Sequence, residues 1–165
     1  MRSTLTVIGL LLVGLATTIS PVRAQEEILL ENNIEYANPD HQHLQVNMAR
    51  PKAKGTYPAI ICIHGGGFRA GSRDGYNELI QRIAKRGYVA LTISYRLAPK
   101  YPFPACVHDV KAAVRWLRAN AKKYHVDPER IGVTGGSAGG TLVQLLGVTE
   151  GVKELEGDEG NPKFS

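Results

Sequence analysis

Cysteine, tryptophan and methionine are scarce in this sequence of 165 residues, which has two cysteines, one tryptophan and two methionines. Only Cys62 and Cys106 could form a disulfide, which excludes a fold held together by a dense disulfide framework. No spacing of cysteine and histidine resembles a zinc site. Cys62 lies in an apolar run and Cys106 near the start of a helical pattern. These positions favour two buried free thiols over a disulfide.

Long apolar runs and blocks of like charge are also missing from most of the sequence. Beyond the first two dozen residues, no run approaches the ~20 apolar residues that cross a bilayer, so we expect no stable membrane span. The 20 lysines and arginines are scattered among 15 acidic residues, and the formal net charge is +5. Scattered charge predicts a solvated surface and gives no indication of nucleic-acid binding.

The N-terminus has the pattern of a secretory signal peptide. An apolar run at 5–19 follows a positive start, and Val22 and Ala24 are small residues at the −3 and −1 positions of a cleavage site. The alternative is a membrane anchor, but the run is only roughly 15 residues long, which is short for a span. We therefore expect cleavage after Ala24, removal of 1–24 and a secreted or periplasmic protein of residues 25–165.

The remaining sequence alternates between strand and helix patterns. The runs at 59–63 and 88–93 are continuously apolar, which is typical of strands buried on both faces of a parallel sheet. The order predicts an α/β fold with a mostly parallel, doubly wound sheet after an antiparallel strand pair, and then a polar tail. We expect strands at 28–36, 44–48, 59–63, 88–93 and 130–134, and helices at 74–86, 105–123 and 137–148.

A G-x-S-x-G motif with Ser137 at its centre lies between the last predicted strand and the last predicted helix. This context is typical of a nucleophile elbow, in which a strained turn exposes a serine hydroxyl above the sheet. Gly135 and Gly139 would let neighbouring backbone pass close to the turn. The alternative, a glycine-rich turn with an incidental serine, does not explain this context.

A second motif, His64-Gly65-Gly66-Gly67-Phe68, directly follows a predicted buried strand. Glycines leave backbone N–H groups open to a ligand, and such groups stabilise the negative charge that forms on a carbonyl oxygen during acyl transfer. A phosphate-binding loop is the alternative. It would need a following Lys-Ser/Thr or a G-x-G-x-x-G pattern, and the sequence has neither.

Together with the segments at 94–99, 101–105 and 127–131, these motifs resemble the hormone-sensitive-lipase-like esterases of the α/β-hydrolase fold. The resemblance covers 44–149, and with the N-terminal pattern it is similar to bacterial carbohydrate-esterase-like members. It implies a small-molecule or polysaccharide ester as substrate and no cofactor or metal. By resemblance, Ser137 is the nucleophile; Gly66, Gly67 and Ala138 supply the oxyanion hole; His64 braces its loop; and Arg96 and Asp109 are structural.

The sequence departs from the family pattern after Ser137, where no histidine follows. The catalytic acid and histidine of this fold come later in the chain than the serine. The acidic residues of the tail lie too close in sequence to the elbow to be the catalytic acid. The five histidines all precede the elbow: His41, His43, His64, His108 and His125. We therefore expect residues 25–165 to be the N-terminal portion of an α/β-hydrolase domain, inactive by itself. The alternatives are a non-catalytic remnant or binding module, or an amidase or peptidase on this fold.

Overall fold

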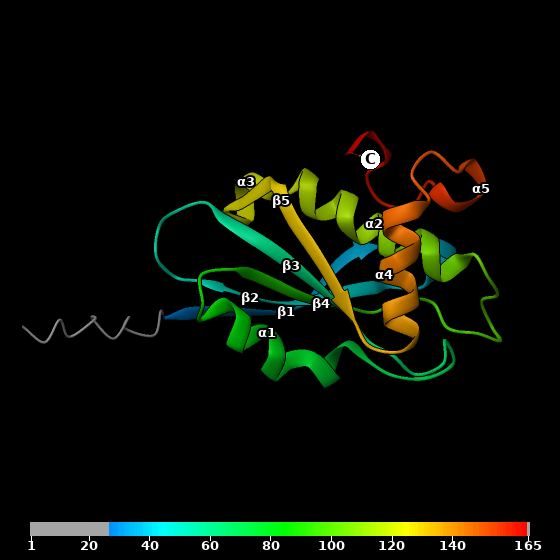
Figure 1. Cartoon of the computed structure of the whole chain (residues 1–165), viewed down its shortest axis with the longest axis horizontal. Coiled ribbons are helices and arrows are strands. Elements are labelled where there is room, and N and C mark those ends of the chain that lie inside the picture. The colour runs from blue at the N-terminus through cyan, green and yellow to red at the C-terminus, as the bar shows by residue number, and fades with distance from the viewer. Residues whose placement is uncertain (1–26, 165) are drawn as a thin grey trace, which may run out of the picture.

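In the computed structural model, which describes residues 27–164, a five-stranded sheet runs through the centre of the molecule (Figure 1). The order in the sheet is β1-β2-β4-β3-β5. β2 pairs antiparallel with β1 and with β4, whereas β3 is parallel to β4 and β5. The predicted antiparallel pair and parallel sheet are thus confirmed. The strands are β1 (Ile28–Ala37), β2 (Leu44–Pro51), β3 (Tyr57–Ile63), β4 (Val89–Ile93) and β5 (Val126–Gly135).

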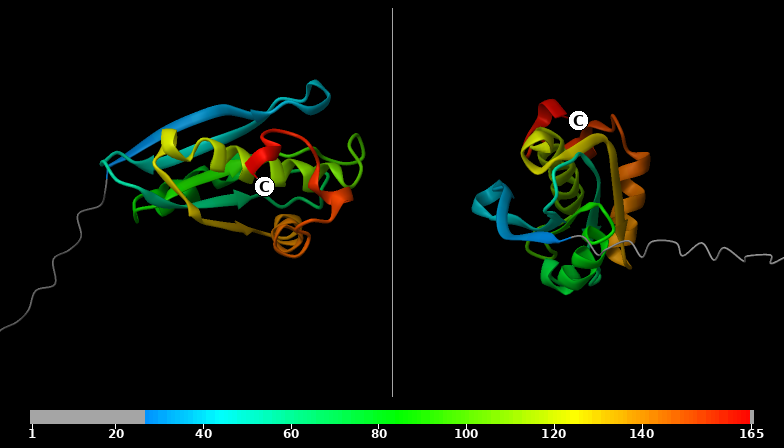
Figure 2. Two further views of the ribbon diagram at one scale, coloured as in Figure 1. Left: turned by 90° about the horizontal axis from the view of Figure 1, so that it is seen from above. Right: turned by 90° about the vertical axis from the view of Figure 1, so that its left-hand side faces the viewer.

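Helices cover both faces of the sheet, with α1 on one face and α2 and α4 on the other (Figure 2). The helices are α1 (Asn77–Ala84), α2 (Ala105–Ala119), α3 (Ala121–Tyr124), α4 (Ala138–Val148) and α5 (Lys153–Glu156). Short 3-10 turns lie at η1 (Pro39–His41), η2 (Arg73–Tyr76) and η3 (Pro162–Phe164).

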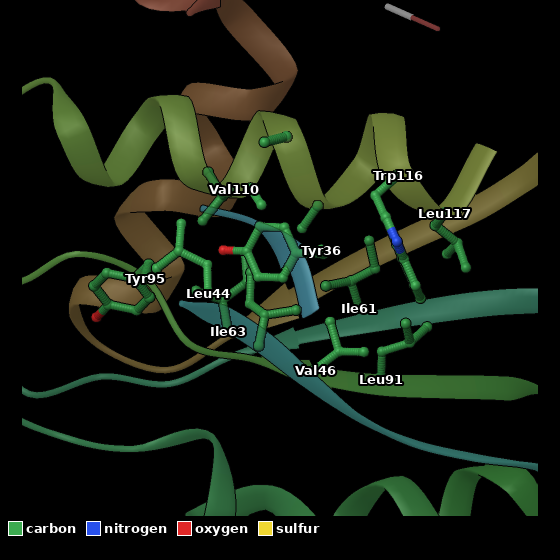
Figure 3. Packing of buried hydrophobic residues seen from close by; sticks show 14 of the residues in the cluster. Tyr36, Leu44, Val46, Ile61, Ile63, Leu91, Tyr95, Val110, Trp116 and Leu117 are labelled. Carbon is green, nitrogen blue, oxygen red and sulfur yellow. The ribbon is translucent and has the colours of Figure 1, made fainter. Parts of the chain in front are cut away.

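Side chains along the central strands point alternately to the two faces of the sheet, and the core therefore has two layers. Ala59, Ile61 and Ile63 of β3 face the larger cluster, which packs under α2 (Figure 3). Ile60 and Cys62, one residue out of phase, face the smaller cluster under α1. Successive strand side chains point to opposite faces, so a strand covered by helices on both sides must be apolar throughout. Each fully buried aliphatic side chain contributes about 1.5–3 kcal/mol.

The two cysteines belong to opposite layers, Cys62 to the cluster under α1 and Cys106 to the cluster under α2. Both are buried and free, as predicted. A disulfide requires Cα atoms within about 7 Å and converging side chains, which residues on opposite faces of a sheet do not offer.

Two predicted helices differ from the structure in length. The predicted helix at 105–123 is divided at Asn120, whose side-chain Nδ2 donates to the carbonyl oxygen of Trp116 at 2.9 Å. Asparagine side chains compete in this way with the helical backbone ladder. The predicted helix at 74–86 begins as the 3-10 turn η2, capped by Ser72, and becomes α-helical only at Asn77.

The polar tail is ordered because basic side chains along α2 bind its backbone. The Lys111 ammonium group donates to the carbonyl oxygen of Thr149 at 2.7 Å, and Arg115 Nη2 donates to that of Glu159 at 2.7 Å. Both basic residues are buried. The predicted polar tail therefore contains α5 and η3, because buried cations need acceptors and the tail carbonyls supply them.

β5 is an edge strand of the described sheet and pairs only with β3 there. Ile131 and Val133 on β5 and Val143 on α4 line a groove of about 590 Å³. Within residues 27–164, no helix is long and apolar enough to cross a bilayer. The predicted signal peptide at 1–24 lies outside the described residues.

Candidate active site

Ser137 occupies the turn between β5 and α4, with φ 51° and ψ −120°. A non-glycine residue at such a φ carries strain of order 1–3 kcal/mol, which persists only where the surrounding structure imposes it. The side chain is exposed to solvent. The G-x-S-x-G motif therefore forms the strained strand-to-helix turn that the sequence predicts.

The glycines of this motif allow the turn to lie directly against β3. A Cβ atom on Gly139 would lie 2.1 Å from the carbonyl oxygen of Ile63, and one on Gly135 would lie 2.8 Å from the same oxygen. Both distances are far below van der Waals contact, so any side chain would displace the elbow from the sheet. These glycines are required by packing.

The glycine loop after β3 meets the elbow at Gly65. A Cβ atom on Gly65 would lie 2.7 Å from the carbonyl oxygen of Gly136 and 3.2 Å from the Cβ of Ser137. The tertiary structure thus brings together two motifs about 70 residues apart in sequence. Parallel strands end at the same edge of the sheet, which explains the meeting of the loops that follow β3 and β5.

Gly66 and Gly67 have positive φ angles of 121° and 60°. A Cβ on Gly66 would lie 2.1 Å from the carbonyl oxygen of Ala70. Within the described part of the chain, neither backbone N–H donates a hydrogen bond to another residue. Ala138 is the first residue of α4, where N–H groups lack an acceptor within the helix. Their convergence on a substrate oxygen stays a prediction.

His64, the first residue of the glycine loop, is buried. Its Nδ1 is 2.8 Å from the carbonyl oxygen of Gly65, and its ring stacks on that of Tyr95 with centroids 4.4 Å apart. Burial lowers the pKa of His64, and the contact with Gly65 opposes this only in part. A neutral ring that contacts Gly65 through Nδ1 and stacks on Tyr95 fits the expected role of bracing the loop better than the role of a catalytic base.

The other four histidines lie away from the elbow. His43 pairs with Glu35, and His108 Nε2 is 3.0 Å from the carbonyl oxygen of Glu154 in the tail. His41 and His125 are exposed, at positive φ. Among residues 27–164, no histidine forms a hydrogen bond with the Ser137 hydroxyl.

Arg96 and Asp109 form a buried ion pair at 2.8 Å. Arg96 also binds Asp40 and Glu159, each through one guanidinium nitrogen. Burial raises the pKa of Asp109, while the hydrogen bonds and charge of Arg96 favour its ionised form. The sequence indicated a structural role for both residues, but it could not reveal their pairing or the two additional carboxylates, which come from distant segments.

No cluster of potential metal ligands occurs in the part of the chain that the structure describes.

Tyr95 was not foreseen as part of the site. Its hydroxyl donates to the carbonyl oxygen of His64 at 3.0 Å. A tyrosine after a buried strand gives no sequence signal for such a contact.

Known proteins resemble this chain over more than half of its length. Arylacetamide deacetylase from Oryctolagus cuniculus is 44% identical over 108 residues, covering 62% of this chain and 27% of that protein. Carboxylesterase NlhH from Mycobacterium tuberculosis is 34% identical over 113 residues, covering 68% of this chain and 34% of that protein. This chain therefore spans about a third or less of the length of these relatives.

Solved esterase structures share the fold. Native esterase 2 from Thermogutta terrifontis superposes with a TM-score of 0.65 at 31% identity, covering 74% of this chain and 44% of that one. Its form phosphonylated by cyclosarin gives a TM-score of 0.67 over 70% of this chain. The α/β-hydrolase fold is thus confirmed, as is the resemblance to hormone-sensitive-lipase-like esterases. A family model described as BD-FAE matches residues 44–164, and the chain belongs to this family.

Proposed function

We propose that this chain carries the nucleophile and oxyanion loop of a carboxylic ester hydrolase that forms an acyl-enzyme on Ser137. The observation that carries the proposal is the strained, exposed Ser137 with Gly65 of the glycine loop directly beside it. A serine at a strand-to-helix elbow next to open backbone donors suits acyl transfer. Membership of a family with esterase relatives supports the same chemistry.

In the proposed reaction, Ser137 Oγ attacks the acyl carbon, and the negative charge moves to the carbonyl oxygen. Gly66, Gly67 and Ala138 would donate their N–H groups to this oxygen. The bond to the alcohol oxygen then breaks, the alcohol leaves with a proton, and water releases the acid from Ser137. The substrate would be a small-molecule or polysaccharide ester, and these steps require no cofactor.

The reaction also needs a base to accept the proton of the Ser137 hydroxyl. No histidine follows Ser137, and none of the described histidines bonds to it. Because the chain covers only 44% of a structurally similar esterase, we propose that the histidine and its acid partner belong to a longer protein. Residues 25–165 alone would then have only residual catalysis.

Two proteins test this proposal: residues 25–165, and a version extended by the C-terminal part of a family member. The extended protein should hydrolyse p-nitrophenyl acetate, and Ser137→Ala should lower the rate by about 10⁴-fold or more. The short protein should show no turnover above that of its own Ser137→Ala variant. A turnover of the short protein that Ser137→Ala abolishes would mean that an upstream histidine is the base. Single alanine variants at the five histidines would then identify it.

Amide hydrolysis is a second candidate, favoured by the 44% identity to a relative named arylacetamide deacetylase. The same elbow and oxyanion hole would serve, since the tetrahedral intermediate is alike. Parallel assays of the extended protein with p-nitrophenyl acetate and p-nitroacetanilide separate the two. Each kcat/KM is compared with the uncatalysed hydrolysis rate of the same substrate, because the ester is intrinsically far more reactive. A larger rate enhancement on the ester supports the esterase, and a larger one on the anilide supports the amidase.

We also propose that the protein is exported and cleaved after Ala24, because its apolar run is short and is followed by small residues at the cleavage positions. N-terminal sequencing of the secreted material should begin at Gln25. A membrane fraction that retains Met1 would contradict export by cleavage.

A further inference from the structure

A cleft of about 640 Å³ lies at the end of the sheet where the glycine loop emerges from β3. It is lined by the start of β2, by η2 and by the segment at 94–101. Two of its lining residues hold the glycine loop directly: Tyr95 bonds to the carbonyl oxygen of His64, and the Ala98 N–H donates to that of Phe68 at 2.8 Å. The cleft and Ser137 therefore border the same loop.

The charge of the cleft is positive. Arg73, Arg96 and Lys100 line it, and no lining residue is acidic. The charge of Arg96 is already balanced by three carboxylates. Arg73 and Lys100 form no ion pair with any residue of the described chain, and the Lys100 ammonium group lies over the ring of Tyr101, 4.9 Å from its centroid.

Arg73 is held in place entirely by neutral groups. Its Nε donates to Asn47 Oδ1 at 3.0 Å, and its Nη2 donates to Gln45 Oε1 at 3.0 Å and to Asn33 Oδ1. Its backbone carbonyl oxygen accepts a hydrogen bond of 2.9 Å from Thr92 Oγ1. These contacts fix the position of the guanidinium group, and none of them is to a carboxylate.

The neighbouring Asp74 forms no salt bridge with this guanidinium group, although the charge of Arg73 helps to lower the pKa of its carboxyl group. Its carboxylate accepts hydrogen bonds from Asn47 Nδ2 at 2.9 Å and from Ser72 Oγ at 3.1 Å. A positioned cation that faces a cleft and has no carboxylate partner is suited to a charge-assisted bond with an anionic ligand.

We propose that this cleft binds a carboxylate on the substrate, and that Arg73 and Lys100 recognise it. Gln42, Ser94 and Tyr101 also line the cleft; the Tyr101 hydroxyl donates to Gln42 Oε1 at 3.2 Å, and Ser94 Oγ bonds to the backbone of Gln45. An acylated acidic sugar, which joins a carboxylate to hydroxyl groups, is the ligand class that suits this wall. The assignment of the ligand as a substrate rests on the proposed ester hydrolysis. The binding of a carboxylate in the cleft does not depend on catalysis and can be measured separately.

The test is a titration of the purified Ser137→Ala protein with glucuronate and with glucose, which differ only at the carboxylate. Nuclear magnetic resonance of arginine Nε–H and backbone amides would follow both. We expect saturable shifts at Arg73 and in the segment at 94–101 with glucuronate, and binding of glucose weaker by about tenfold or more, the effect of one charge-assisted bond.

Substitutions distinguish binding in the cleft from a general electrostatic attraction of glucuronate to the protein. Lys100→Gln, at an exposed residue, should weaken glucuronate binding several-fold without affecting the fold, and Arg73→Gln should weaken it by about tenfold or more. Lys122→Gln, which removes an exposed charge on α3, is the matched control and should leave binding unchanged. Equal binding of both sugars, no binding, or equal effects of Lys100→Gln and Lys122→Gln would overturn the proposal. Since Ser137 is absent from the tested protein, failure of ester hydrolysis would not alter these outcomes.

Discussion

The Tyr95 hydroxyl donates a hydrogen bond of 3.0 Å to the carbonyl oxygen of His64, and the rings of these two residues stack 4.4 Å apart. Tyr95 therefore holds the first residue of the glycine loop through both its backbone and its side chain. Both residues are buried, so neither contact can be replaced readily by water. This pair, together with the hydrogen bond from the Ala98 N–H to Phe68, holds the loop beside Ser137.

Tyr95→Phe should keep the ring contact and remove the hydrogen bond. Because the carbonyl oxygen of His64 would lose a buried donor, we expect a loss of about 1–3 kcal/mol in the free energy of unfolding. Tyr57→Phe is the control, since its hydroxyl bonds to the carbonyl oxygen of Ala53 in an exposed position. Urea unfolding measures both, and equal losses would show that the Tyr95 hydroxyl has no special role.

Gly139→Ala and Gly147→Ala compare two glycines of the same helix. A Cβ on Gly139 would lie 2.1 Å from the carbonyl oxygen of Ile63, whereas a Cβ on Gly147 would meet nothing within 4 Å. We expect Gly139→Ala to destabilise the protein by about 1–3 kcal/mol or more, because backbone must move. Gly147→Ala should stabilise it by up to about 1 kcal/mol, because alanine favours the helix. Thermal unfolding midpoints that shift in the same direction for both variants would contradict the packing argument.

Docking of the tail should weaken in acid. The hydrogen bond from Lys111 lowers the pKa of Glu156 below 4.5, with support from the N–H of Gly151. The contribution of Glu156 to stability is therefore fully present above pH 4.5 and is lost as the pH falls through its lowered pKa. The protection factor of the Gly151 amide, which is its exchange rate relative to the intrinsic rate at the same pH, should fall across this range, and Glu156→Gln should remove the change. Glu129→Gln, at an exposed position, should retain it.

The two thiols should be inert in the folded protein. Burial raises the pKa of Cys62 to about 11 and also raises that of Cys106. Only the thiolate reacts with Ellman's reagent, so at pH 8 about one Cys62 side chain in a thousand is ionised, and burial blocks access as well. We expect two thiols to react in guanidinium chloride and none to react rapidly without it. An absence of reactive thiols in denaturant would mean that a disulfide forms.

The sequence by itself determined the element types and the elbow. Apolar runs such as Ala59–Ile63 can be satisfied only by burial on both faces, and this predicts a covered parallel strand. The elbow is also indicated locally, because Ser137 between two spaced glycines follows a strand pattern and precedes a helix pattern. Signals of this kind depend on neighbours in sequence and can be read without coordinates.

Only the tertiary structure decided which distant residues meet. Gly65 lies against Ser137, and the Arg96 guanidinium binds Asp40, Asp109 and Glu159 from three other segments. A buried charge can be satisfied by any carboxylate that the chain places nearby, so the choice of partner depends on how the helices and loops pack. For the same reason the sequence predicted only a polar tail, whereas contacts with the buried cations of α2 order it.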